Sequence, residues 1–225
     1  MLLQLFKCNS YFEFIDKACR KLFPSKIFKL GKAYLLSCQT NKLIPTRQLK
    51  NVLIRKASEV DLSIIVACES ERNGETLFRA YFETGRQCYV AIFENRCIAY
   101  AWAFYKNTTI TFDNYQQSNI LTILPQNSCF IGDGFIHPEW RMKGLFPLLI
   151  AYIFDDLSQK HSITTVYNHI YYSSEHSMRS STRLGFTLQK TIIYVRLLNI
   201  QWIVIYSKDG NQKMQKLTSE TELVL

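Results

Sequence analysis

Residues 132–146 read GDGFIHPEWRMKGLF, and this stretch is the most informative part of the chain. The apolar pattern around it predicts a strand over 129–136, followed by a loop and an apolar helix. A helix start carries unpaired N–H groups and a partial positive charge, which together attract anions. Gly144 has no Cβ and lets a ligand approach the backbone, while Arg141 and Lys143 add positive charge. The pattern predicts either a phosphate-binding loop or an ordinary strand–turn–helix with a glycine in its turn.

A second stretch, residues 174–186, reads SEHSMRSSTRLGF and begins about 40 residues after the first. In the same order, the two stretches resemble the two motifs of the GNAT acyltransferase superfamily, R/Q-x-x-G-x-G/A and N-x-x-A-x-x-x-Y-x-x-G-F. Arg141 and Gly144 match the first motif, with Phe146 at its last small position. Two motifs in order are more specific than either alone, and the resemblance covers roughly residues 53–198.

The resemblance implies an α/β fold with a mixed sheet, of the GNAT type with an N-terminal helical extension, and acetyl-CoA as the acyl donor. In the family, the loop of the first motif wraps the pyrophosphate. The strand before it splays from its neighbour and binds the pantetheine arm through its backbone. Serines at the start of the second helix are expected to hydrogen-bond the cofactor. The cofactor-binding residues expected on this basis are Phe135, Ile136, Arg141, Met142, Lys143, Gly144, Leu145, Phe146, Ser174 and Ser177.

Asp133 is the candidate catalytic residue. It lies between Gly132 and Gly134 in an apolar strand, where glycines indicate a bulge or a close backbone approach, or simply relieve crowding. Acyl transfer to an amine needs a base, and a carboxylate can take the proton directly or through water. The alternative role for Asp133 is a structural acceptor for loop N–H groups. His137 could relay protons, but His-Pro at this place is common in the family without a catalytic role.

The second motif departs from the family at position 181. Ser181 stands where the family often has a tyrosine that protonates the departing thiolate of CoA. A serine is a weaker acid than a phenol, so this role is open. Tyr171 or Tyr172 could supply the proton instead, or the thiolate leaves unaided because it is stable near neutral pH.

Positive charge is concentrated near the N-terminus. Residues 1–56 hold 12 Lys and Arg against two acidic residues, a net charge of +10, whereas residues 57–225 hold 15 against 16. The near-neutral main domain argues against a basic nucleic-acid groove, so no nucleic acid is expected there. The basic segment has three interpretations, of which packing of its apolar face on the main domain is favoured. The others are a peripheral contact with an anionic membrane and nucleic-acid binding.

Three segments are expected along the chain: a basic helical N-terminal segment (1–50), a GNAT-like acetyltransferase domain (51–207) and a loose C-terminal tail (208–225). The first should contain two helices, one from Ser10 to about residue 23 and a second over 25–37. The main domain should follow the order β-α-α-β-β-β-α-β-α-β-β in one central sheet. Three consecutive strands before the loop helix distinguish this order from a doubly wound fold.

Seven scattered cysteines form no CxxC pair, so neither a metal site nor a disulfide framework is expected. Their odd number, and a short apolar start with the wrong flanks for a signal peptide, indicate a reducing cytoplasm. The sequence also lacks an apolar run of the length, about 18 residues, that a membrane-spanning helix needs.

These features predict an N-acetyltransferase that moves an acetyl group from acetyl-CoA to a primary amine by direct attack. The two stretches are most similar to GNAT proteins linked to bacterial surface-polysaccharide pathways, which implies an amino sugar as the small-molecule acceptor. Two alternatives stay open. Ser181 and Phe146 favour a non-catalytic CoA-binding or interaction module. A protein or peptide N-acetyltransferase would need an acidic cleft for basic peptides, and no acidic cluster is obvious in the sequence.

Overall fold

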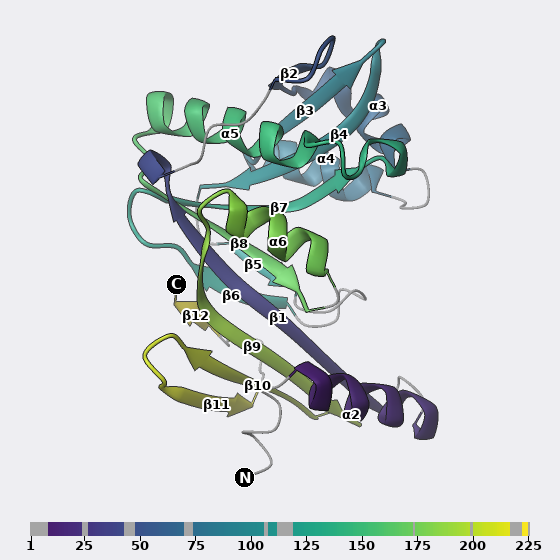
Figure 1. Ribbon diagram of the computed structural model, residues 1–225, viewed down its shortest axis with the longest axis vertical. Coiled ribbons are helices and arrows are strands. Elements are labelled where there is room, and N and C mark those ends of the chain that lie inside the picture. Colours follow the sequence, from purple (N-terminus) through teal and green to yellow (C-terminus); the bar gives the residue numbers. More distant parts are fainter. Residues whose placement is uncertain are drawn as a thin grey trace.

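The computed structural model describes residues 9–23, 27–42, 48–69, 74–105, 108–111, 119–172, 174–198, 200–216 and 222–224. These residues form two sheets flanked by helices (Figure 1). The larger sheet has nine strands in the order β11-β10-β9-β1-β8-β7-β4-β3-β2, and the smaller one has the order β12-β6-β5. The mixed α/β class expected from the sequence is confirmed.

The strands of the large sheet are rich in aromatic and branched aliphatic residues, which suit a pleated and buried surface. Its neighbouring strands pair antiparallel, except that β7 and β8 run parallel. A parallel pair needs a crossover, and the helix between these two strands supplies it. The bounds are β1 (Phe28–Gln39), β2 (Leu53–Lys56), β3 (Gln87–Phe93), β4 (Arg96–Phe104), β7 (Ser128–Ile136), β8 (Thr165–Tyr171), β9 (Thr187–Leu197), β10 (Ile200–Ser207) and β11 (Gln212–Lys216).

Helices cover both faces of the large sheet. On one face, α3 and α4 pack over an aromatic core that includes Phe78 and Trp102. On the other face, α5 and α6 pack over the strands around Ile131, and α2 covers the far end through Phe12. No helix in the described part of the chain is long and apolar enough to cross a membrane. The bounds are α2 (Asn9–Leu22), α3 (Leu62–Cys68), α4 (Glu75–Glu83), α5 (Leu145–His161) and α6 (Glu175–Arg183), with short 3-10 turns at Thr40–Lys42, Glu59–Asp61 and Pro138–Trp140.

The N-terminal segment differs from its prediction in one respect. The first helix is present as α2, beginning at Asn9, one residue before the expected N-cap Ser10. The second helix, expected over 25–37, is wrong, because the chain there forms the long strand β1. β1 lies inside the large sheet and pairs with β8 on one side and β9 on the other. This part of the basic segment is therefore integral to the sheet of the main domain.

The C-terminal region and the middle of the chain also add structure. The loose tail expected from residue 208 instead contains β11, which pairs with β10, and β12 (Glu222–Val224). Two further strands lie in the middle of the chain, β5 (Thr108–Thr111) and β6 (Asn119–Ile123). They do not join the central sheet, and β12 pairs with β6 to form the smaller one. The expectation of a single sheet is wrong for this reason.

Candidate active site at the diverging strands

The parallel strands β7 and β8 separate halfway along their length. Their pairing runs from Ser128 opposite Thr165 to Ile131 opposite Asn168 and stops there. Beyond that point, β7 continues beside β4 and β8 continues beside β1. Residues 132–136 and 169–171 therefore face each other without ladder bonds between them. A backbone edge of this kind can bind an extended ligand as an additional strand does.

A bulge in β7 marks the start of this divergence. Trp102 of β4 lies opposite Gly132, but Tyr100 lies opposite Phe135, so β7 carries one extra residue. Asp133, within the bulge, has a left-handed backbone conformation with φ 47°. Aspartate tolerates this conformation better than most residues do. Bulges of this kind redirect a side chain. The structure thus gives a local reason for the Gly-Asp-Gly sequence.

The two glycines beside Asp133 have different roles. A Cβ on Gly132 would lie 2.7 Å from the ring of Phe130, so crowding in the core excludes a side chain there. A Cβ on Gly134 would lie 3.2 Å from the carbonyl oxygen of Tyr100, and Gly134 is exposed. The interpretation of relieved crowding therefore holds for Gly132, while Gly134 lets the bulged strand stay close to β4.

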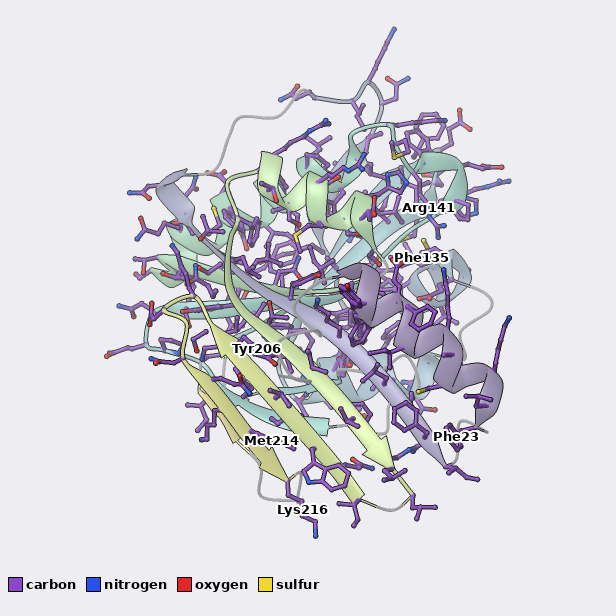
Figure 2. The ribbon with its side chains drawn as sticks, turned by 60° about the horizontal axis from the view of Figure 1, so that its bottom comes forward. Phe23, Phe135, Arg141, Tyr206, Met214 and Lys216 are labelled. Carbon is purple, nitrogen blue, oxygen red and sulfur yellow. The ribbon has the colours of Figure 1, made fainter. Side chains whose placement is uncertain are left out.

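The end of β7 directs backbone groups away from β4. The N–H of His137 donates to the carbonyl oxygen of Ile98 at 2.9 Å. Because backbone groups alternate along an antiparallel pair, those of Ile136 face the divergence. Arg141 Nε donates to the carbonyl oxygen of Ile136 at 3.1 Å, and the guanidinium carbon lies 5.7 Å from the ring centre of Phe135. Figure 2 shows Arg141 and Phe135 close to each other.

The loop between β7 and α5 is shaped by two left-handed residues, Met142 (φ 63°) and Gly144 (φ 81°). Met142 is 82% exposed, and no protein atom lies within 4 Å of the position that a Cβ on Gly144 would take. The space above Gly144 is therefore open to a ligand. The ammonium nitrogen of Lys143 lies 5.2 Å from the ring centre of Trp140. Trp140 in turn packs on Phe93, and this contact anchors the loop to β3.

The first turn of α5 is suited to an anion. The N–H of Leu148 donates to the carbonyl oxygen of Gly144 at 3.3 Å, and Pro147 has no N–H. The N–H groups of Leu145 and Phe146 are thus the ones left for a ligand at the helix start. The first turn has no acidic side chain to compete for them. Leu145 and Phe146 pack their side chains in the core, so they contribute through the backbone.

The second motif forms the start of α6. Ser174 is the N-cap; its N–H donates to the carbonyl oxygen of Tyr171, and its own carbonyl oxygen accepts the N–H of Met178. Ser177 is exposed in the first turn. Both serines follow the end of β8, which borders the divergence. Ser181 differs, because it is fully buried and its hydroxyl has no hydrogen-bond partner.

A group of polar side chains lies on the α3–α4 face beside Asp133. The ring of His169 on β8 stacks on the ring of Phe130, with 5.6 Å between the ring centres, and packs edge-on against the ring of Tyr171, with 5.2 Å between the centres. Burial lowers the pKa of His169 to about 4, although the nearby Asp133 carboxylate opposes this effect. The imidazole is therefore neutral at physiological pH, and its burial disfavours the protonated form. The hydroxyl of Tyr100 donates to the Glu69 carboxylate, and the Tyr100 ring stacks on Phe135.

His169 and Glu69 are functional candidates that the sequence analysis missed. For His169 a signal existed: Tyr167, His169 and Tyr171 occupy alternate positions of a predicted strand and so share one face. No comparable signal links Glu69 to Tyr100, because 31 residues separate them. Two other candidates lie elsewhere. The hydroxyl of Tyr172 donates a hydrogen bond to the carboxylate of Asp16 on α2. The Nδ1 atom of His137 lies 3.8 Å from the carboxylate of the exposed Glu139.

Two other features of the described residues bear on possible chemistry. The described cysteines that carry free thiols are Cys19, Cys38, Cys68, Cys88, Cys97 and Cys129, and within the described ranges no group of three or more His, Cys, Asp or Glu is arranged to hold a metal. A hollow beside Tyr105 and Ser128 lies at the opposite end of β7 from the loop, and its lining has no charged side chain. The divergence is the better candidate.

No protein-family model and no curated protein sequence matches the chain. Solved structures match its fold. A conserved protein of unknown function from Staphylococcus epidermidis has a TM-score of 0.53 and 11% identity, and the match covers 80% of this chain and 64% of that chain. A GNAT-family acetyltransferase from Colwellia psychrerythraea has a TM-score of 0.53 and 13% identity, covering 76% and 57%. A GCN5-related N-acetyltransferase from Kribbella flavida has a TM-score of 0.51 and 13% identity, and the match covers 75% of this chain and 59% of that chain.

These matches show that the chain has a GNAT-type fold. The low identity means that the likeness is one of fold alone. The chain also spans only about half to two thirds of the length of the structures that it matches.

Proposed function

We propose that the chain is an N-acetyltransferase that moves an acetyl group from acetyl-CoA to a primary amine. One observation carries this proposal: β7 and β8 diverge directly beside a helix start whose loop holds Gly144 in a left-handed, open conformation. The divergence offers a backbone edge to an extended arm, and the helix start offers N–H groups to a phosphate. A ligand with both parts, such as acetyl-CoA, fits the two features together.

The residues present fit the donor as follows. The backbone of Ile136 would hold the pantetheine arm along β7, and the neighbouring Phe135 would line the path of the arm. The loop from Arg141 to Phe146 would hold the pyrophosphate, with the side chain of Arg141 already oriented by its bond to Ile136. Ser174 and Ser177 would contribute hydroxyls from the start of α6. When bound, acetyl-CoA supplies an acyl group activated as a thioester.

Asp133 is the proposed base. The bulge places it on β7 within electrostatic reach of His169, on the face that α3 and α4 cover. A carboxylate here can take the proton of an acceptor ammonium directly or through water, with the buried, neutral His169 beside it. The closeness of the two groups favours this role over a purely structural one, in which Asp133 only holds loop N–H groups.

Proton donation on the other side of the reaction falls to Tyr171 in this proposal. Ser181 is fully buried, so its hydroxyl is remote from solvent, and a hydroxyl of this kind is a weak acid. Tyr172 donates to Asp16. Tyr171 shares a face with His169 and carries a phenol at the end of β8, beside the divergence. We propose an amino sugar as the first acceptor class to test.

The donor site is tested by thermal unfolding with and without acetyl-CoA, for the wild type and for Gly144→Glu. We expect acetyl-CoA at about 100 times its Kd to raise the wild-type Tm by about 5 °C or more. Gly144→Glu should abolish the rise, because it adds a carboxylate where the phosphate would bind. Gly210→Glu is the matched control, since Gly210 also has a left-handed backbone (φ 84°) and open space around it.

The outcomes separate the candidate functions. A rise that is lost only in Gly144→Glu would locate the donor in this loop, and acceptor amines would then be screened with amino sugars and basic peptides in parallel. Binding without turnover on any amine would favour the non-catalytic module. A wild-type Tm that does not change with acetyl-CoA would refute the proposed donor.

A further inference from the structure

Exposed apolar side chains gather where α2 ends beside the β9–β10 turn. The N–H of Leu198 donates to the carbonyl oxygen of Ile27 at 2.6 Å, and Phe28 pairs with Leu197 across the sheet. The rings of Phe23 and Phe28 lie 6.2 Å apart. Figure 2 shows Phe23 in this corner, at the end of α2. We define the apolar patch by the exposed side chains of this corner, Leu22, Phe23, Ile27, Leu197 and Leu198, together with Phe14, which is exposed about two turns earlier on α2.

Several members of the patch are strongly exposed. Phe14 is 72% exposed, Leu22 73% and Leu198 59%. The helix has a separate apolar side for packing, on which Phe12 is fully buried against β1 and β10. α2 therefore carries apolar residues on two sides, and one side is covered by the sheet. A contiguous exposed apolar surface usually marks a binding partner.

The charge beside the patch is positive. Lys17 and Lys21 are exposed and follow Phe14 by three and seven residues, so all three share one side of α2. Of the two acidic residues of α2, Asp16 is buried and accepts a hydrogen bond from Tyr172, which leaves Glu13 as the exposed one. The first 56 residues hold a net charge of +10. The partner of this surface should therefore be both apolar and negatively charged.

We propose that the apolar patch and its two lysines bind the surface of an anionic lipid bilayer. Aromatic and leucine side chains enter the boundary between headgroups and acyl chains, while lysine ammonium groups remain among the lipid phosphates. A second copy of the chain fits less well. A two-fold contact through the same patch would bring Lys17 and Lys21 of both copies together, and like charges oppose association.

The test is co-sedimentation of the full chain with two kinds of vesicle, phosphatidylcholine alone and phosphatidylcholine mixed with phosphatidylserine. We expect binding to the mixed vesicles and much weaker binding to the neutral ones. Phe14→Ser with Leu22→Ser, and separately Lys17→Glu with Lys21→Glu, should each weaken binding about tenfold or more. Val60→Ser with Met214→Ser is the matched control, because both residues are exposed and apolar but lie outside the patch.

Each variant is also checked for folding by its thermal transition and for size by light scattering. The proposal is overturned if the wild type does not bind the mixed vesicles, or if the control loses as much binding as the patch variants. Loss of vesicle binding in the lysine variant alone, with binding retained in Phe14→Ser with Leu22→Ser, would indicate a general polyanion site instead. A dimer that the patch variants dissociate would assign the patch to a second copy. None of these outcomes depends on acetyl-CoA binding.

Discussion

Asp133 shows how one residue can combine a structural and a chemical role. Its left-handed backbone makes the extra residue of the β7 bulge, and glycines on both sides make that conformation compatible with the core. Strained positions of this kind persist where function requires them. The bulged residue carries a carboxylate within electrostatic reach of His169, whose pKa is lowered to about 4 mainly by burial. The site therefore pairs a carboxylate with a neutral imidazole.

Replacing Asp133 with asparagine tests its proposed role as base. Asparagine tolerates the left-handed conformation and keeps the size of the side chain, so the fold should be unchanged. We expect turnover to fall by about 100-fold or more, as for loss of a general base, while the acetyl-CoA-dependent rise in Tm remains. Asp209→Asn, in the exposed turn between β10 and β11, is the control. Unchanged turnover in Asp133→Asn would assign Asp133 to the structural role.

Single residues of the candidate site were predicted unevenly. The bulge at Gly132 to Gly134 could be expected from local sequence, because glycines flanking a polar residue in an apolar strand are unusual. The burial of Ser181 could not, since its motif position indicates a functional residue and only packing between α6 and the sheet reveals that it is covered. His169 was missed because its importance depends on which strand lies beside β8.

At the scale of elements, the start of α3 is fixed to β2 by charge. Arg55 donates two hydrogen bonds to the carboxylate of Asp61, at 2.7 and 2.8 Å, and the N–H of Ser58 donates a third at 3.0 Å. Asp61 is only 6% exposed. These bonds, above all those from Arg55, lower the pKa of Asp61 from 3.8 to about 2. The arrangement positions α3, which covers the face that holds His169.

The lowered pKa of Asp61 predicts a pH dependence of stability. Because the pKa is lower in the folded chain than in the unfolded one, the stabilisation is present above pH 4 and is lost as the pH falls toward 2. We expect this stabilisation of the folded chain to reach about 1–2 kcal/mol, because solvent screens the partly exposed Arg55 and reduces the full value. The difference in free energy of unfolding between wild type and Asp61→Asn, measured by urea denaturation, should shrink over that range.

The exposed pair Glu75–Arg79 provides the control for this measurement. The Arg79 guanidinium nitrogen and the Glu75 carboxylate oxygen lie 3.1 Å apart, but both side chains are more than half exposed. Glu75→Gln should therefore have little effect on the free energy of unfolding at any pH. A wild-type to Asp61→Asn difference that stays constant between pH 7 and pH 2, about the range in which carboxylates titrate, would contradict the prediction.

β1 is the element that local sequence misassigned. Its residues include good helix formers such as leucine, lysine and alanine. Both of its faces are buried, with Leu35 on one side and Leu36 on the other, so the alternation of polar and apolar residues that marks a half-exposed strand is absent. Pairing with β8 and β9 overrides the local preference. By contrast, β7, α5, β8 and α6 were predicted well, because turn residues separate them and each carries its own pattern.

At the scale of the whole molecule, the N-terminal strand joins two parts of the sheet. β1 separates β8, which borders the candidate site, from β9, β10 and β11. In Figure 1 it runs as a long strand through the lower half of the sheet, between β8 and β9. The order of elements in the sequence does not reveal such an insertion, because the strand is distant from both partners along the chain. Only long-range pairing places it there.

The central position of β1 predicts that the main domain cannot fold without it. A chain of residues 51–225 would expose the edges of both β8 and β9 and lose core residues from both faces, so we expect no cooperative thermal transition. In the full chain, Leu35→Ala should lower the free energy of unfolding by about 2–5 kcal/mol, since Leu35 is fully buried. The control Leu53→Ala, on edge strand β2 and 57% exposed, should cost about 0.5 kcal/mol or less. A truncated chain that melts cooperatively near the wild-type Tm would instead make residues 51–225 an independent domain, with β1 added to a sheet that is stable without it.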